Sequence, residues 1–132
     1  MVKTYVSLRL MSSSKSPEQM FLELEVPADH SWRKGERRKK ASVVARENGY
    51  EFRLDQPGEM SLEEQTDLLL ARVDPISDRI RTLGCDVVQL ACVLYASQMP
   101  AICFSSSVIA KLARLSASID VDLYVEEGNW AE

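Results

Sequence analysis

The sequence predicts an α+β two-layer sandwich, in which three helices cover one face of a mixed or mostly antiparallel sheet of about five strands. Some stretches alternate apolar and polar side chains with the period of a strand, and others repeat apolar residues at three- or four-residue steps, as helices do. The two kinds follow one another in the order β-α-β-α-β-β-α-β. Strands that alternate need cover on only one face, so helices on one side of the sheet are sufficient.

The length of 132 residues predicts a single domain that spans residues 1–132. No stretch approaches the roughly 20 apolar residues of a membrane span, and Met1–Leu10 lacks the apolar block of a signal peptide. We therefore expect a cytoplasmic protein that does not enter membranes. Three cysteines without a CxxC spacing are expected to be reduced core thiols that form no disulfide, namely Cys85, Cys92 and Cys103.

The first two predicted elements are a strand and a short helix. Lys3–Leu10 alternates, with Val6, Leu8 and Leu10 on one side. Ser16 is a suitable N-cap for a helix that has Pro17 at its first position and ends before Pro27. The apolar side of this helix consists of Met20, Phe21 and Leu24.

Ala28–Gly49 is the least regular part of the chain, and we expect a long loop here. Ser42–Ala45 is the one stretch in it that could form a short strand. Tyr50–Asp55 alternates again, which predicts a strand with Glu51 and Arg53 on its outward side.

A long helix is predicted to begin after Ser61, because Glu64 completes a capping box with it. Pro75 is expected to kink this helix or to restart it with Asp74 as a new cap, and Gly84 to end it. The predicted apolar stripe comprises Leu62, Leu69, Val73, Ile76, Ile80 and Leu83.

The remaining elements are three strands and a helix. Asp86–Tyr95 has apolar residues on both sides, as a central strand does. Ala101–Phe104 is predicted to be a short strand, and Ser105 or Ser106 to cap a helix whose apolar residues are Val108, Ile109, Leu112 and Leu115. In the last strand, Ile119–Glu126, we expect the inward side chains to be Ile119, Val121, Leu123 and Val125.

No set of residues in the chain suggests catalysis, a cofactor or a bound metal. His30 is the single histidine, and no glycine-rich phosphate loop is present. Asp120 and Asp122 share one side of a strand with their carboxylates roughly 7 Å apart, but no third ligand is near in sequence. We therefore predict a protein that is not an enzyme and has no cofactor or metal.

The outward face of the predicted sheet combines an apolar and aromatic middle with a charged rim, which is the anatomy of a protein interface. Its candidate partner-binding residues are Tyr5, Tyr95, Asp120, Asp122 and Tyr124. The alternative is that the loop of residues 28–49 folds over this face and covers it.

A basic tract forms the second candidate site. Residues 32–40 contain six basic residues and one acidic residue, which gives +5, so the rest of this chain of net charge −4 carries −9. Its candidate binding residues are Trp32, Arg33 and Arg37, which could bind a phosphate group or an acidic protein. The alternative is a solvated charge run in which Trp32 pins the loop to the sheet. Because the body of the chain is acidic, general nucleic-acid binding is not expected.

Several stretches resemble the bacterial domain-of-unknown-function family 4279 over nearly the whole chain. They are "SPEQMFLELEVPADHSWRKGERR", "YEFRL", "LEEQTDLLLARVDPISDRIRTLG" and "FSSSVIAKLARLSASIDVDLYV". The family's short motifs correspond here to Trp32, Lys34 and Gly35, then Leu112 and Leu115, then Asp120, Asp122 and Tyr124. Where this chain has Tyr50, Glu51 and Phe52, members of the family typically carry a tryptophan. The resemblance implies no known reaction, and relatives of this size often accompany toxin genes as immunity proteins.

The function predicted from the sequence is therefore protein binding, either to another protein, such as a toxin that an immunity protein neutralises, or to a second copy. The alternative is a small-molecule or nucleotide-sensing domain that uses the basic loop 32–40.

Overall fold

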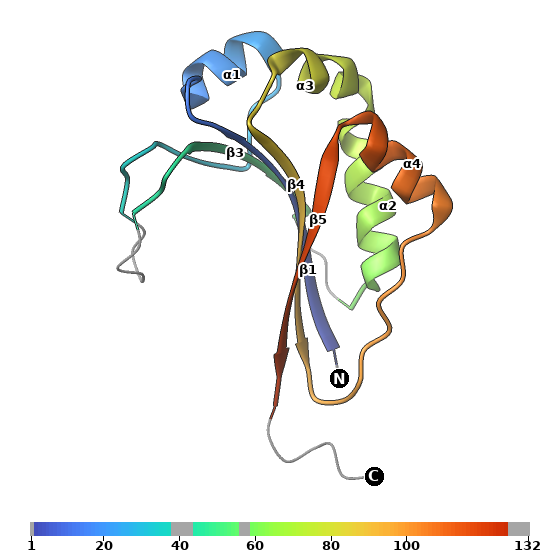
Figure 1. The fold of residues 1–132 in the computed structure, drawn as a ribbon. Helices are drawn as coiled ribbons and strands as arrows, with labels where there is room; N and C mark the ends of the chain where they lie inside the picture. Colours follow the sequence, from blue (N-terminus) through green and yellow to red (C-terminus); the bar gives the residue numbers. More distant parts are fainter. Residues whose placement is uncertain (1, 38–43, 56–58, 127–132) are drawn as a thin grey trace.

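The protein is described by a computed structural model that covers residues 2–37, 44–55 and 59–126. It contains a five-stranded sheet in the order β2-β3-β1-β4-β5 (Figure 1). The pairs β2–β3, β3–β1 and β1–β4 are antiparallel and β4–β5 is parallel. The predicted α+β class with a mixed sheet is confirmed. The elements are β1 (Val2–Ser12), α1 (Pro17–Leu24), β2 (His30–Trp32), β3 (Asn48–Arg53), α2 (Leu62–Val73), a 3₁₀ turn (Asp74–Ile76), α3 (Ser77–Leu83), β4 (Val87–Ala96), α4 (Ser106–Arg114) and β5 (Ala117–Val125).

Three of the helices, α1, α2 and α4, begin where the sequence places their caps. Ser16 and Ser61 each form a complete capping box, with Gln19 and Glu64 respectively. The Ser105 hydroxyl accepts the hydrogen bond of the Val108 amide at the start of α4. These three helices therefore start where a side chain supplies the acceptor that their first amide groups lack.

The predicted long helix is interrupted at Pro75, as expected. Residues Asp74–Ile76 form a 3₁₀ turn between α2 and α3, because proline has no amide hydrogen to donate and its ring crowds the preceding turn. The prediction that Asp74 caps the second half is wrong. Asp74 lies inside the 3₁₀ turn, and the N-cap of α3 is Ile76, which makes no side-chain capping bond.

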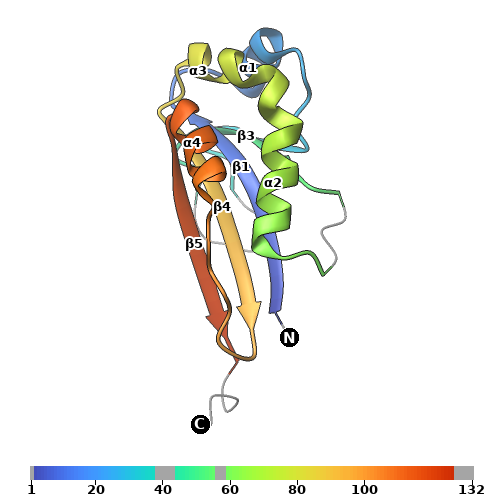
Figure 2. The ribbon, with the colours of Figure 1, turned by 90° about the vertical axis from the view of Figure 1, so that its right-hand side faces the viewer.

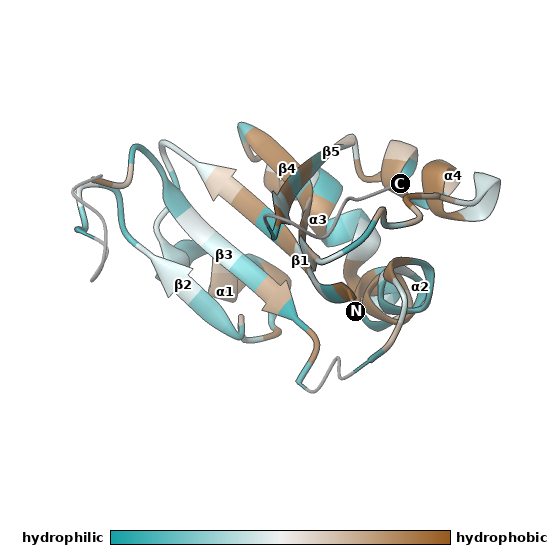
Figure 3. Ribbon diagram, turned by 90° about the horizontal axis from the view of Figure 1, so that it is seen from below, coloured by the Kyte–Doolittle hydropathy of each residue, from teal (hydrophilic) through white to brown (hydrophobic). Residues whose placement is uncertain are grey.

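The helices lie on one side of the sheet, where α2 packs on β1 and α4 on β5, while α1 and α3 pack together at one end (Figure 2). The core lies between these layers. Its largest fully buried side chains include Leu8, Leu10, Met20, Leu24, Phe52, Leu69, Leu70, Ile80, Leu83, Leu90 and Leu94. The predicted apolar stripe of α2 and α3 is buried throughout. Seen from below, β2 and β3 are mostly hydrophilic and β4 is mostly hydrophobic (Figure 3).

The predicted strand Ala101–Phe104 is not formed. Because β5 runs parallel to β4, the chain must return to the start of β4, and residues 97–105 form part of this return. An additional strand, β2, lies in the segment predicted to be a loop. Of the stretch Ser42–Ala45 that could form a short strand, residues 42 and 43 lie outside the described part. Val44 forms an isolated bridge with Arg37.

Several side chains predicted to be inward are exposed. Ile119, Leu123 and Val125 lie on the helix side of β5, but β5 is an edge strand and they remain well exposed. Phe21 on α1 and Ile109 on α4 are also exposed, because each points away from the packed side of its helix. Among the cysteines, which are all unpaired, Cys92 is buried, Cys85 is half-buried and Cys103 is exposed, so Cys103 is not a core thiol.

Candidate functional site

Three tyrosines gather on the face of the sheet that carries no helices. Tyr95 of β4 stacks on Tyr124 of β5, with ring centroids 5.1 Å apart, and meets Tyr5 of β1 edge-on at 6.1 Å. Their exposed fractions are 49% for Tyr5, 47% for Tyr95 and 55% for Tyr124. We call these three side chains the tyrosine cluster. Strand pairing explains it, because Tyr95 lies directly beside Tyr124 in the register of β4 and β5.

Acidic side chains border the tyrosine cluster. Asp122 pairs with Val93 and Asp120 with Ala91 across β4 and β5, so both aspartates lie on the same face as Tyr124. Both are exposed. The outer side of β5 has no neighbouring strand among the residues described, so its main chain forms a free sheet edge beside the cluster. The structure thus brings five of the predicted partner-binding residues into one patch.

The residues of the basic tract lie elsewhere, at the opposite edge of the sheet. Trp32 of β2 is only 8% exposed, because its ring packs directly on Gly49 of β3. Arg33 forms an ion pair with Glu18 of α1, and the main chain of Arg37 forms an isolated β-bridge with that of Val44. Lys39 and Lys40 lie outside the described residues, as does Arg38. The described part of residues 28–49 leaves the tyrosine cluster half exposed, and Trp32 pins this segment to the sheet.

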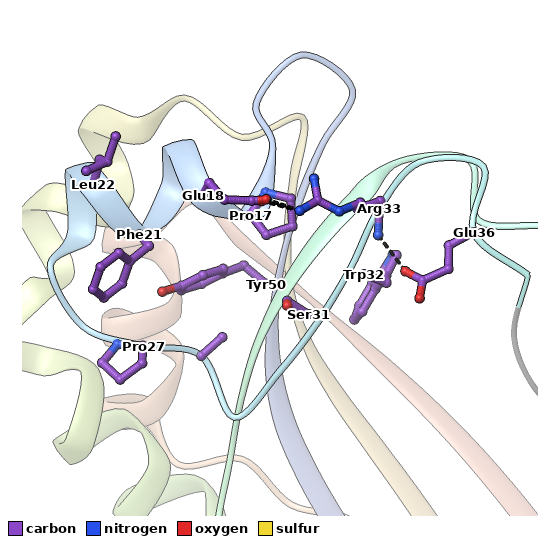
Figure 4. Close-up of a pocket in the computed structure, with 11 residues that line it drawn as sticks. Pro17, Glu18, Phe21, Leu22, Pro27, Ser31, Trp32, Arg33, Glu36 and Tyr50 are labelled. Carbon is purple, nitrogen blue, oxygen red and sulfur yellow. Dashed lines mark hydrogen bonds and ion pairs between the residues drawn. The ribbon is translucent and has the colours of Figure 1, made fainter.

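A cavity of about 650 Å³ lies between α1 and the chain that leads into β2 (Figure 4). Phe21, Leu22 and Pro27 form its apolar end, and the Glu18–Arg33 ion pair lies toward the other end. Sequence reasoning missed this cavity, since it assigned Phe21 to the core. In its wall, the Tyr50 hydroxyl donates a hydrogen bond to the Val26 carbonyl oxygen. Burial raises the pKa of Tyr50 above its ordinary value.

A buried carboxylate lies on the same sheet face as the tyrosine cluster, closer to β2. Glu51 of β3 was predicted to point outward into solvent, but it is only 1% exposed. Its carboxylate accepts hydrogen bonds from Arg9 Nε at 2.6 Å, from the Ser7 hydroxyl at 3.1 Å and from Arg53 Nε. Glu51 lies on the predicted face of the sheet. It is nevertheless buried, because the side chains of Arg9 and Arg53 cover its carboxylate.

Electrostatics keep Glu51 ionised despite its burial. Loss of water raises the pKa of its carboxyl group, but the hydrogen bonds and charges of Arg9 and Arg53 outweigh this effect and hold the pKa below its ordinary value. Nothing in the sequence pattern signals this site, since an alternating glutamate on a strand resembles any solvated one. Only the pairing of Arg9 with Glu51 across β1 and β3 brings the charges together.

No metal site emerges in the part of the chain that the structure describes. Asp120 and Asp122 have no third carboxylate, histidine or cysteine grouped with them there. His30 lies on β2, where its ring is 5.6 Å from that of Trp32. Across the described helices, none is long and apolar enough to cross a membrane.

Comparison with known proteins identifies a family and nothing more specific. No curated protein matches the chain, and no solved structure matches it. A family model described as "Domain of unknown function (DUF4279)" matches residues 2–126. This range includes every described strand and helix. The chain therefore belongs to the DUF4279 family.

Proposed function

We propose that this chain is a non-enzymatic protein-binding domain and that the tyrosine cluster is the centre of its binding surface. The observation that carries the proposal is that three half-exposed aromatic rings on adjacent strands already rest on one another. Rings held by their neighbours lose little further conformational freedom when a partner packs on them. Tyrosine also supplies a large apolar area together with a hydroxyl group, which is why it is common at interface hot spots.

The partner expected at this surface is a protein with a basic patch. Asp120 and Asp122 border the cluster, and the whole chain carries a net charge of −4. Such a field steers a basic partner to the surface. A toxin that acts on nucleic acid has a surface of this chemistry, and its neutralisation by an immunity protein is the specific form of this proposal.

The same charges argue against a second copy of this chain as the partner. Two β5 edges could pair antiparallel to extend the sheet. The aspartates of both copies would then lie on one face of the joined sheet, since directly opposite residues share a face. In the register centred on Val121, Asp120 of each copy would lie opposite Asp122 of the other, and facing like charges destabilise a strand pair.

Site-specific cross-linking tests where a partner binds. A photoreactive phenylalanine analogue replaces Tyr95 in one variant and Phe21, an equally exposed aromatic residue on α1, in the control. We expect one protein to be cross-linked in native cells from position 95 and not from position 21. Cross-linking from position 21 alone would move the site to the cavity beside α1.

Binding kinetics with the purified partner then separate the roles of the rings and the charges. Tyr95→Ala is expected to weaken binding by about 2 kcal/mol, or roughly 30-fold, mainly through faster dissociation. Asp120→Asn with Asp122→Asn is expected to slow association and to reduce its dependence on salt. The matched control is the pair Glu63→Gln and Asp67→Asn on α2, which removes two exposed charges on the other side of the sheet.

One outcome would refute the sheet-face site directly. If Tyr95→Ala binds as the parent does while Arg33→Ala with Arg37→Ala abolishes binding, the basic loop is the site. Thermal unfolding of each variant shows whether a loss of binding reflects a loss of fold.

A further inference from the structure

Two cavities open on the helix-free face of the sheet, on either side of the buried Glu51. One has a volume of about 420 Å³ and the other of about 390 Å³, which is within the range of small-ligand sites. Arg9, Glu51 and Arg53 line both cavities. His30 and Arg37 contribute to the first one, and Tyr5 to the second. These three shared residues therefore form the partition between two adjoining hollows.

Glu51 holds both arginines by the same atom of each side chain. Arg9 lies directly across from Glu51 on β1, and Arg53 follows two residues later on β3, so all three share a face. Each arginine donates its Nε hydrogen to Glu51. Among the described residues, the terminal nitrogens of the two guanidinium groups make no hydrogen bond, although each carries two hydrogens. These donors are left for a ligand in the cavities.

A buried carboxylate of this kind is a poor way to stabilise a fold. Removing two opposite charges from water costs about as much as their attraction returns, and apolar residues of similar volume often do as well or better. The arginines, in contrast, keep part of their surface exposed, 28% of the side chain for Arg9 and 53% for Arg53. The arrangement buries the anion that orients the guanidinium groups and leaves their outer ends accessible.

The charge around the larger cavity is opposite to that of the chain. Three arginines (Arg9, Arg37 and Arg53) face two glutamates (Glu36 and Glu51), which leaves one net positive charge. The Glu36 carboxylate already accepts the hydrogen bond of the Arg33 amide. An otherwise acidic protein therefore has a locally positive hollow in its sheet face.

We propose that Arg9 and Arg53, oriented by Glu51, bind the phosphate group of a small phosphomonoester. Planar guanidinium groups present paired donors that match the oxygen atoms of phosphate. Arg37 adds a third positive charge in the larger cavity, and the His30 ring also lines it, where it can contact the organic part of a ligand. Most of this site belongs to the sheet, and the basic loop contributes Trp32, Glu36 and Arg37 to the lining of the larger cavity. None of the three tyrosines of the cluster lines the larger cavity, so this site does not require a protein partner at the cluster.

Titration of the ¹⁵N-labelled protein with inorganic phosphate and with adenosine monophosphate tests the proposal by NMR. We expect both to shift the amide signals of residues 7–9 and 51–53, and the nucleotide to bind more tightly because it also contacts a ring. Arg53→Gln should weaken phosphate binding by at least about tenfold, as expected for loss of a charge-assisted hydrogen bond. Arg114→Gln is the matched control, since this arginine is exposed on α4, and it should leave the affinity unchanged.

Glu51→Gln separates a positioning role from simple attraction of charges. Removing a negative charge should strengthen phosphate binding if only the net charge matters. If Glu51 positions the arginines, the same change should weaken binding although the site becomes more positive. Arg53→Lys provides a second measurement should the Glu51→Gln variant unfold. Lysine keeps the positive charge but lacks the planar guanidinium group, so we expect the Arg53→Lys variant to bind phosphate several-fold more weakly.

The proposal would be overturned by either of two results. One is a titration in which phosphate shifts no signal of residues 7–9 or 51–53. The other is an affinity that Arg9→Gln and Arg53→Gln leave equal to that of the Arg114→Gln control.

Discussion

The packing of Trp32 on Gly49 makes Gly49→Ala a sharp test of the structure. A methyl group at position 49 would lie 2.0 Å from Cε2 and 2.1 Å from Cζ2 of the Trp32 ring. Carbon atoms in contact are about 3.5–4.0 Å apart, so the ring must move by about 1.5 Å or more. A buried tryptophan covers about 150–250 Å². Exposing about half of that area at roughly 25 cal/mol per Å² predicts a loss of about 2–3 kcal/mol in the free energy of unfolding.

Urea denaturation followed by fluorescence measures this loss. Trp130→Phe in the background makes Trp32 the only tryptophan, since the chain has two. We expect a lower urea midpoint and a red-shifted emission of Trp32 in the native state. Gly49→Ala should cost much less in a Trp32→Ala background, where no ring is present to collide with; this arm contains no tryptophan, so its unfolding is followed by circular dichroism. If the two changes instead add, with no coupling in the double-mutant cycle, the proposed contact between residues 32 and 49 is wrong.

Three further predictions concern the core, the buried charge and the thiols. Leu69→Ala should destabilise the protein by about 2–5 kcal/mol in urea denaturation, whereas Leu68→Ala, at an exposed neighbouring position, should change stability by less than about 0.5 kcal/mol; equal effects would contradict the assigned helix face. Because the folded protein holds the pKa of Glu51 below its ordinary value of 4.5, the stability it provides is present above about pH 4.5 and is lost as the pH falls through the lower folded pKa. Glu51→Gln should thus be less stable at neutral pH and lose less stability on acidification, and parallel pH profiles of the two proteins would argue against this. Burial raises the pKa of Cys85 to about 11 and that of Cys92 to about 12. The exposed Cys103 should therefore react first with a thiol reagent in the native protein, as mass spectrometry of the labelled peptides can show, and faster labelling of Cys92 would refute its burial.

The elements that were predicted well depend on residues close together in the sequence. A capping box joins residues three apart, such as Ser61 and Glu64, and the break at Pro75 follows from a missing amide hydrogen within one turn. Several of the predictions that were wrong concern which side chains are covered by other elements, as in the edge strand β5. An apolar alternation such as that of β5 looks the same in a central strand and in an edge strand, although only the central one is covered.

The sequence predicted only part of the candidate site, because the contacts between its residues depend on how the strands pair. The alternation of each strand predicted that the tyrosine cluster, Asp120 and Asp122 lie on the outward face. The register of β1, β4 and β5 then brings the three rings into contact. The basic loop was predicted to offer Trp32 to a partner or to pin itself to the sheet. In the structure the Trp32 ring packs on the neighbouring strand, where Gly49 leaves room for it.

By itself, the sequence determined the N-caps of α1, α2 and α4, the alternation of β1, β3 and β5, the α+β class and the membership of the family, since all of these are written in local patterns or in the order of motifs. Only the tertiary structure decided which strands lie at the edges, where Trp32 packs, and that Glu51 is buried between two arginines. The physical reason is that burial and charge pairing depend on neighbours across the sheet. Arg9 and Glu51, for example, are 42 residues apart in the chain and 2.6 Å apart in space.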